Sequence, residues 1–308
     1  ATPKPRRLFF PSWAILPSGT RRLQGQGYRT KVTGPITAFI GGLSVFRVLT
    51  WNMNHGFRDA RQRRAAWSFL SETVKPDVAL LQEILLQGDK SEQAVHQPGG
   101  IGGGRNWGSA VVTFGPSLSK VTHSRTRWSK KDAPLMVALP GTVMIADAVL
   151  DDGSTVTLVS MYGAIEYGYA VTTVHKQLSD LTPLFESKRK DQIILGGDLN
   201  CSTQLASPHG YWHANLFNRI LQFGLVDLLE QTKVCRTPRP DCVCDDVPSC
   251  GHVQTYRHPR SAVPWQDDYL FASTKLAEKL VDCYALDDGE PDPWSLSDHC
   301  PIVADFEL

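Results

Sequence analysis

Short apolar segments and amphipathic segments alternate along most of this chain. β-Branched and aromatic residues predict a strand over residues 46–51, and a second apolar segment predicts a buried strand over 77–82. Between them, residues 61–74 place apolar side chains at helical spacing, after the helix-capping residue Asp59 and before Pro76. A helix between two short buried strands is typical of a layered α/β fold.

The same alternation continues to the end of the chain. Further strands are predicted at residues 107–114, 136–139, 143–150, 155–161, 192–195, 268–272, 280–284 and 302–306. Further helices are predicted at 169–186, where Pro183 is expected to disturb the last turn, and at 212–223. Because strands and helices are interleaved throughout, we expect one α/β domain over residues 46–308, with two packed mixed sheets flanked by helices.

Residues 1–45 lack this periodicity. They hold basic residues, prolines and glycines but no acidic residue. We expect a poorly ordered extension outside the fold, with a phosphate-contacting basic arm and a targeting segment as the alternatives. The apolar stretch at 36–46 is too short to cross a bilayer and no other segment is long enough, so we expect no membrane span.

Composition is that of an ordinary globular protein. Of the 308 residues, 42% are hydrophobic and 20% are charged. The formal net charge is +1, so the overall field of the molecule does not indicate a nucleic-acid partner. A preference for such a partner would have to come from local groups of residues.

Polar side chains lie at the ends of several predicted strands. The clearest example follows the apolar residues 193–195, where two glycines, which permit close backbone approach, precede Asp198. The full set is Asn52, Glu83, Asp198, Asn200, Asp268, Asp298 and His299. Carboxylates, amides and an imidazole, without soft ligands, suit a hard divalent cation and a phosphate.

This ordered set of motifs resembles the endonuclease/exonuclease/phosphatase superfamily, which has the DNase-I-like fold. The motifs are Trp51-Asn52, Gln82-Glu83, Gly197-Asp198-Leu199-Asn200, Asp268-Tyr269 and Ser297-Asp298-His299, with Gly108-Ser109-Ala110 and Thr255-Tyr256 as further matching positions. The resemblance covers residues 46–308. It implies a four-layer α/β/β/α sandwich with the site at one end of two mixed sheets. It also implies hydrolysis of a phosphate ester that depends on Mg²⁺, with Mn²⁺ as a substitute.

The resemblance also implies roles for individual residues. Glu83 would be the principal metal ligand, assisted by Asn52 and by Asp298. Asp198 would orient or deprotonate the attacking water, and Asn200 would hold that water or a phosphate oxygen. Which residue is the general base stays open, because coupled groups share protons.

Three further residues complete the implied site. His299 would contact the scissile phosphate, and Asp268 would orient its imidazole, although the adjacent Asp267 is an alternative partner. Tyr162 occupies the place where some members carry a tyrosine and others a histidine, and its hydroxyl would help to bind the phosphate.

A second group of candidate ligands lies in the long loop at residues 232–264. Cys242, Cys244, Cys250 and His252 have the softness that tetrahedral Zn²⁺ prefers, although their spacing is not that of a standard zinc finger. A structural zinc would explain how this insertion, at about 235–252, is ordered. Disulfides, such as Cys235 with Cys250, and free thiols are the alternatives. Zinc would favour a cytoplasmic location, and disulfides would favour secretion.

The substrate is open at this stage. The segment that contains Arg125, Arg127 and Trp128 interleaves cations with an aromatic ring, which suits a phosphate backbone and a stacked base. The Arg-Leu pair that inositol polyphosphate phosphatases carry after their Asp-x-Asn is absent after Asn200. We therefore expect a monomeric nuclease acting on DNA or RNA. The alternatives are an enzyme acting on a small phosphorylated metabolite or lipid head group, and a non-catalytic binding module.

Overall fold

The computed structural model describes residues 45–86, 92–99, 106–166, 170–205, 209–232, 241–244 and 250–308. The N-terminal extension expected at residues 1–45 therefore lies outside the described residues except for Val45, and so does Cys235.

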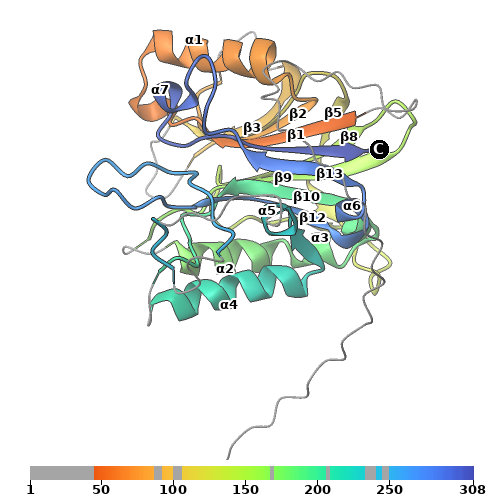
Figure 1. The fold of residues 1–308 in the computed structure, drawn as a ribbon. Helices are drawn as coiled ribbons and strands as arrows, with labels where there is room; N and C mark the ends of the chain where they lie inside the picture. Colours follow the sequence, from red (N-terminus) through yellow and green to blue (C-terminus); the bar gives the residue numbers. More distant parts are fainter. Residues whose placement is uncertain are drawn as a thin grey trace, which may run out of the picture. The chain divides into compact units, whose positions relative to one another are not determined.

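Two six-stranded mixed β-sheets lie face to face at the centre (Figure 1). The first sheet has the order β13-β14-β1-β2-β4-β3. Its strands are β1 (Val45–Asn52), β2 (Val78–Ile84), β3 (Ala94–Pro98), β4 (Gly108–Thr113), β13 (Leu280–Ala285) and β14 (Ile302–Glu307). In this sheet β1 is parallel to β2 and antiparallel to β14, so strands from both ends of the domain meet at its centre.

The second sheet has the order β11-β12-β10-β9-β8-β5. Its strands are β5 (Ser117–Lys120), β8 (Val143–Val149), β9 (Thr155–Met161), β10 (Ile193–Asp198), β11 (Leu225–Asp227) and β12 (Asp268–Ser273). Here β10 is parallel to β9 and antiparallel to β12. A two-stranded ribbon is formed by β6 (His123–Ser124) and β7 (Ala133–Pro134).

Helices cover the outer face of each sheet, as Figure 1 shows. The first sheet is covered by α1 (Ala60–Ser68), its continuation η2 (Phe69–Val74) and α7 (Pro293–Leu296). The second is covered by α2 (Val171–Asp180), α3 (Thr182–Phe185) and α4 (His209–Gln222). The remaining short helices are η1 (His55–Phe57), η4 (Lys188–Asp191), α5 (Leu228–Gln231) and α6 (Thr274–Ala277).

Alternation of side chains along each strand explains these layers. Val48 of β1 and Ile194 of β10 belong to the core between the two sheets. Residues at an odd number of positions from these two point to the opposite face of their sheet. Trp51 packs under α1 and η2, where its ring lies 5.8 Å from that of Phe69. Leu195 packs against the helices of the second sheet. The four-layer α/β/β/α architecture expected from the sequence is therefore confirmed.

Two consecutive glycines in β10 allow the close packing beside the strand end. A Cβ atom on Gly197 would lie 1.7 Å from the carbonyl oxygen of Met161 in the neighbouring strand. A Cβ atom on Gly196 would lie 2.6 Å from a methyl group of Leu270. These contacts leave no room for a side chain at Gly197. The close backbone approach expected at this glycine is therefore present.

Some local predictions were wrong. No strand forms at residues 136–139, where Met136 is exposed and Val137 packs partly on the outer core. The prediction rested on apolar character alone, and it was wrong because this segment pairs with no neighbouring strand. The helix predicted at 169–186 is two helices, since α2 ends at Asp180 and Pro183 lies in the first turn of α3. The mainly polar edge strand β5 was missed.

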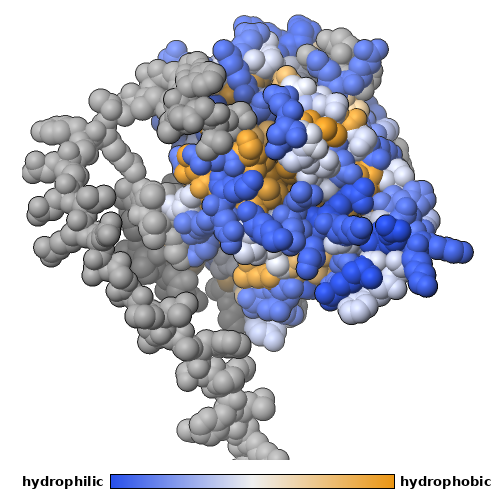
Figure 2. Space-filling model, turned by 90° about the vertical axis from the view of Figure 1, so that its right-hand side faces the viewer, coloured by the Kyte–Doolittle hydropathy of each residue, from blue (hydrophilic) through white to orange (hydrophobic). Residues whose placement is uncertain are grey.

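No helix within the described residues is long and apolar enough to pass through a membrane. Figure 2 shows the right-hand side of the view in Figure 1, on which most residues are hydrophilic and the hydrophobic areas are small. Exposed apolar side chains on the described part of the chain include Phe57, Trp128 and Tyr211.

Candidate active site

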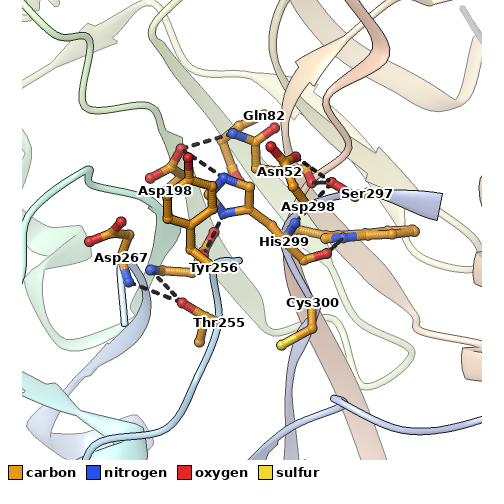
Figure 3. A network of polar contacts seen from close by, with 12 residues as sticks. Asn52, Gln82, Asp198, Thr255, Tyr256, Asp267, Ser297, Asp298, His299 and Cys300 are labelled. Carbon is orange, nitrogen blue, oxygen red and sulfur yellow. Dashed lines mark hydrogen bonds and ion pairs between the residues drawn. The ribbon is translucent and has the colours of Figure 1, made fainter. Parts of the chain in front are cut away.

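The polar residues at strand ends come together where the two sheets meet at one edge (Figure 3). Asn52 is the last residue of β1, Asp198 is the last residue of β10 and Asp268 is the first residue of β12. Because β10 and β12 are antiparallel, Asp198 and Asp268 lie opposite each other in the ladder. Asn52, from the other sheet, hydrogen-bonds to Asp198, so residues of both sheets contribute to the site.

Asp198 is buried and receives several hydrogen bonds. The side-chain amide of Asn52 donates to Oδ2 over 2.8 Å. Asn200 donates twice, from its backbone N–H to Oδ1 over 2.9 Å and from its side chain to Oδ2 over 3.0 Å. Asn200 can turn back in this way because it adopts a left-handed conformation, with φ of 49°. The carboxylate is thus held in one orientation.

His299 lies between two carboxylates. Its Nδ1 atom is 2.8 Å from Oδ2 of Asp268, and its Nε2 atom is 3.9 Å from Oδ2 of Asp198. Burial lowers the pKa of the imidazole, but the charges of Asp268 and Asp198 outweigh burial and raise it to about 10. The ring is therefore an oriented cation at neutral pH, with Asp268 rather than Asp267 as its partner.

Burial also shifts the acidic groups around His299. It raises the pKa of Asp198 well above its usual value, with Asp268 and Asp267 adding to the effect and His299 opposing it. Burial raises the pKa of Asp267 to about 7, against the attraction of His299. The cluster therefore contains more carboxyl groups than the single imidazolium charge can neutralise. Such a group of residues with shifted pKa values favours proton transfer.

Glu83 lies beside this cluster rather than inside it. It has a left-handed backbone conformation, φ 51°, at an irregularity in the pairing of β2 with β4. Its Oε1 atom is 3.3 Å from Nδ2 of Asn52, and the hydroxyl of Tyr162 also hydrogen-bonds to Glu83. Burial raises the pKa of Glu83, against the hydrogen bonds from Asn52 and Tyr162 and the charge of His299.

Asp298 completes the group of expected metal ligands. Asn54 donates to its Oδ1 atom over 2.6 Å, and the Arg58 guanidinium is 3.6 Å away. Asn54 is not among the residues predicted from the sequence, although its position two residues after Asn52 could have indicated it. Ser297, within a recognised motif, donates to the backbone carbonyl of Asn52 over 2.7 Å and so joins the two segments.

The donor set fits a hard divalent cation. Glu83, Asn52 and Asp298 offer only oxygen atoms as ligands, and the acidic groups outnumber the cationic ones. Asp198, Asp268 and His299 also lie close enough to hold an ion. In that trio, Nδ1 of His299 already lies 2.8 Å from Asp268, so only Nε2 could face an ion.

Tyr256 covers the imidazole of His299. The two rings are stacked, with centroids 4.6 Å apart and planes 27° from parallel. Burial and the surrounding carboxylates raise the pKa of Tyr256 to about 12, so its hydroxyl stays neutral. The Thr255-Tyr256 motif is visible in the sequence, but the stacking contact depends on the fold.

A cavity of about 380 Å³ opens beside the cluster. Its lining includes two polar residues of the site, Asn200 and Asp267, and the rings of Tyr256, His213 and Trp265. The cavity therefore places aromatic surfaces next to the expected phosphate position.

The structure does not bring Arg125, Arg127 and Trp128 to this site. Arg127 lies 3.5 Å from Glu186, and its guanidinium lies 4.6 Å from the centroid of the Trp128 ring. Glu186 precedes the start of β10, whereas Asp198 ends that strand. The segment that contains Arg125, Arg127 and Trp128 is therefore an exposed part of the surface away from the site.

The cysteine cluster forms a separate group. The ligand atoms of Cys242, Cys244, Cys250 and His252 all lie within 4.8 Å of one another. The sulfur atoms of Cys242 and Cys244 are 3.5 Å apart, far beyond the roughly 2 Å of a disulfide bond. The four ligand atoms are therefore close enough to hold one metal ion together.

Comparison with known proteins identifies a family. A sequence profile of the Endonuclease/Exonuclease/phosphatase family matches residues 49–299, which contain every residue of the central cluster. No curated protein sequence gives a significant match.

Solved structures share the fold at low sequence identity. An AP endonuclease from Archaeoglobus fulgidus is 20% identical, covering 85% of this chain and 100% of that chain, with a TM-score of 0.53. AP endonuclease LMAP from Leishmania major is 19% identical, covering 86% and 88%, with a TM-score of 0.54. D. rerio TDP2, complexed with a single-strand DNA product, is 17% identical, covering 86% and 100%, with a TM-score of 0.54. Likeness at this level shows the fold alone.

Proposed function

We propose that the substrate of this chain is nucleic acid and that it cuts phosphodiester bonds. The chain belongs to the endonuclease/exonuclease/phosphatase family and is therefore a metal-dependent hydrolase of phosphate esters. The observation that carries this proposal is the buried His299 cation between Asp268 and Asp198. An oriented cation and an adjacent basic carboxylate are what an attack of water on a phosphate ester requires.

Each residue of the cluster has a role in this proposal. Asp268 holds the imidazole of His299, whose Nε2–H donates to a phosphate oxygen and stabilises the charge that develops there. Asp198, held by Asn52 and Asn200, orients and deprotonates the attacking water. A raised pKa makes its carboxylate a stronger base than an exposed aspartate.

The rim of the site supports a nucleotide substrate. The cavity beside Asn200 is lined by Tyr256, His213 and Trp265, and aromatic rings next to a phosphate position can stack on a base. Arg58 lies 3.6 Å from Asp298, so a cation is also present at the edge of the cluster. A site for a small phosphate ester would not need this aromatic wall.

Two metals belong to the proposal. Mg²⁺, with Mn²⁺ as a substitute, would be held by Glu83 with Asn52 and Asp298, and when bound it would neutralise charge on the phosphate. Tyr162 would support Glu83 and the phosphate through its hydroxyl. A structural Zn²⁺ would occupy the cysteine cluster, which a reducing compartment such as the cytoplasm would favour by keeping the thiols reduced.

Hydrolysis of supercoiled plasmid and of labelled single- and double-stranded DNA and RNA tests the function. We expect cutting with Mg²⁺ or Mn²⁺ and none with EDTA. Glu83→Ala should lose most of that activity, because it removes the principal metal ligand. Glu278→Ala, which removes an exposed glutamate, is the matched control and should cut like the wild type.

Two results would contradict the proposal. Cutting by Glu83→Ala at the wild-type rate would show that the metal site is misplaced. Absence of cutting by a folded, metal-loaded wild type, together with phosphate release from small phosphomonoesters, would instead favour a phosphatase of small metabolites or lipid head groups.

A further inference from the structure

We infer that the zinc site at Cys242, Cys244, Cys250 and His252 positions the catalytic residues, in addition to ordering its own loop. Within the described residues this group is distinct from the expected Mg²⁺ ligands, because it offers sulfur and nitrogen where they offer oxygen. The expected effect of zinc on turnover rests on the proposed function, whereas the presence of zinc does not.

The distances match tetrahedral zinc coordination. A Zn–S bond of about 2.3 Å places two sulfur ligands of a tetrahedron roughly 3.7 Å apart. The sulfur atoms of Cys242 and Cys244 are 3.5 Å apart, and Sγ of Cys242 is 3.7 Å from Nδ1 of His252. Cys242 and Cys250 are buried, so solvent has little access to half of the ligands.

His252 has the second hydrogen bond that zinc-bound histidines use. While Nδ1 faces Cys242, the other ring nitrogen, Nε2, lies 2.7 Å from the hydroxyl of Thr203. A partner for the second nitrogen fixes the ring orientation and leaves the lone pair of Nδ1 for the metal. Thr203 lies three residues after Asn200, so this contact links the cluster to the loop that follows β10.

Gln204 forms a second and more buried link. Its side-chain amide donates to the sulfur of Cys242 over 3.3 Å and to the backbone carbonyl of Pro264 over 2.9 Å. Its carbonyl oxygen accepts from the backbone N–H of Gln266 over 2.7 Å. One buried side chain therefore ties a zinc ligand to the segment that leads into Asp267 and Asp268.

The segment between His252 and Asp268 carries the residues that surround the catalytic imidazole. The hydroxyl of Thr255 accepts hydrogen bonds from the backbone N–H groups of Asp267 and Asp268, each over 3.0 Å. The next residue, Tyr256, stacks on His299, as Figure 3 shows. Zinc would hold the start of this segment at Cys250 and His252, while β12 holds its end.

Loss of zinc should therefore make the stacking of Tyr256 on His299 and the position of Asp268 less fixed, without unfolding the two sheets. A displacement of about 1 Å at a catalytic group can lower turnover on the order of 100-fold. We expect zinc-free protein to show turnover about 10-fold to 100-fold below that of the wild type, with Mg²⁺ saturating.

Metal analysis of the full-length chain tests the site itself. We expect one zinc per wild-type chain, and substoichiometric zinc in Cys250→Ser and His252→Ala. His252→Cys should retain zinc, because it supplies another soft ligand. Cys283→Ser, which changes a cysteine of β13, is the matched control and should also retain zinc. Cobalt substitution should give the absorption bands of a tetrahedral thiolate site.

Turnover and hydrogen exchange test the coupling. In Cys250→Ser we expect lower kcat, faster amide exchange over residues 250–268, and a cooperative unfolding transition that remains. Gln204→Ala keeps all four ligands, so it should keep zinc but lower kcat. His252→Cys should restore both turnover and protection relative to His252→Ala.

Each outcome decides a different part of the inference. Wild-type protein without zinc, when produced in zinc-supplemented medium under reducing conditions, would overturn the site. Zinc-free variants with full turnover and unchanged exchange at 250–268 would overturn the positioning role. If the wild type cuts no nucleic acid, the proposed function fails, while metal content and exchange still decide whether zinc orders this segment.

Discussion

At the residue scale, the chemistry depends on how buried charges compensate one another. His299 is protonated because Asp268 and Asp198 offset the unfavourable burial of its charge. Asp198 in turn has a raised pKa, because burial outweighs the attraction of His299 and the hydrogen bond from Asn52. Removal of one member therefore changes the proton affinity of the others, and single substitutions in this cluster should have large effects on turnover.

Asp198→Asn should lower kcat about 1000-fold, because it removes the base while keeping the size of the side chain. Circular dichroism and a cooperative urea transition should show that the fold is retained. Asp152→Asn, in the exposed turn between β8 and β9, is the matched control and should keep wild-type kcat. Wild-type kcat in Asp198→Asn would remove Asp198 from the mechanism.

His55 gives a residue-scale prediction about stability and pH. Burial, with a smaller contribution from the charge of Arg63, lowers its pKa to about 4, and its Nδ1 accepts a hydrogen bond from the backbone N–H of Leu85 over 3.1 Å. Between pH 6.5 and pH 4 the unfolded chain binds the proton more strongly, so folding stability falls as pH is lowered through this range. At pH 5 the loss should be about 2 kcal/mol relative to pH 7.

Urea unfolding at pH 7 and pH 5 measures this effect. His55→Asn should be less stable at pH 7 but should lose less stability between the two pH values than the wild type does. His123→Asn, which changes an exposed histidine, should keep the wild-type difference. An equal loss in His55→Asn and in the wild type would assign the pH dependence to other groups.

At the scale of single elements, the site depends on where strands end and how closely they pack. Asp198 reaches the cluster from β10, which has no side chains at Gly196 and Gly197, where a Cβ atom would meet Leu270 and the backbone of Met161. Glu83 reaches it because an irregular pairing of β2 with β4 turns its side chain toward Asn52. Strand geometry, more than loop flexibility, therefore sets the relative positions of these groups.

Gly197→Ala should destabilise the domain by more than about 3 kcal/mol, because its Cβ would meet the backbone carbonyl of Met161, which cannot move aside. Gly153→Ala is the comparison. Gly153 has φ of 81° but open space around it, so alanine there should cost only about 1 kcal/mol. Thermal or urea unfolding of the two variants measures the difference, and equal losses would contradict the packing argument.

At the scale of the whole molecule, the proposed active site requires both sheets. Asn52 and Glu83 come from the first sheet, whereas Asp198 and Asp268 come from the second. The first and last strands, β1 and β14, are paired along six positions at the centre of the first sheet. Neither half of the chain contains a complete site, so folding of the domain and assembly of the site are one event.

A chain of residues 45–308 should therefore fold and act by itself. We predict a single cooperative unfolding transition and a kcat equal to that of the 308-residue chain, because the described site includes no residue before Asn52. The salt dependence of nucleic-acid binding would report any phosphate contact made by the basic residues 1–44. Loss of kcat in the shorter chain would show that residues 1–44 contribute to catalysis.

Apolar patterns in the sequence predict the layered fold and most of its central strands, and polar residues at strand ends predict the members of the cluster. Alternating apolar residues reveal which faces are buried, and polar residues at strand ends are visible because they interrupt that pattern. These local signals failed at 136–139, where apolar character did not indicate a strand, and at β5, where a polar edge strand gave little signal.

Which of these residues lie close together depends on the three-dimensional fold. It separated Arg127 and Trp128 from the site and brought Tyr256 onto His299. It also connected the cysteine cluster to the catalytic segment through Gln204. Such contacts join residues that are far apart in the chain, and they depend on sheet order and packing distance, which a one-dimensional pattern does not contain. The same is true of the proton affinities of Asp198 and His299, because burial and neighbouring charges set them.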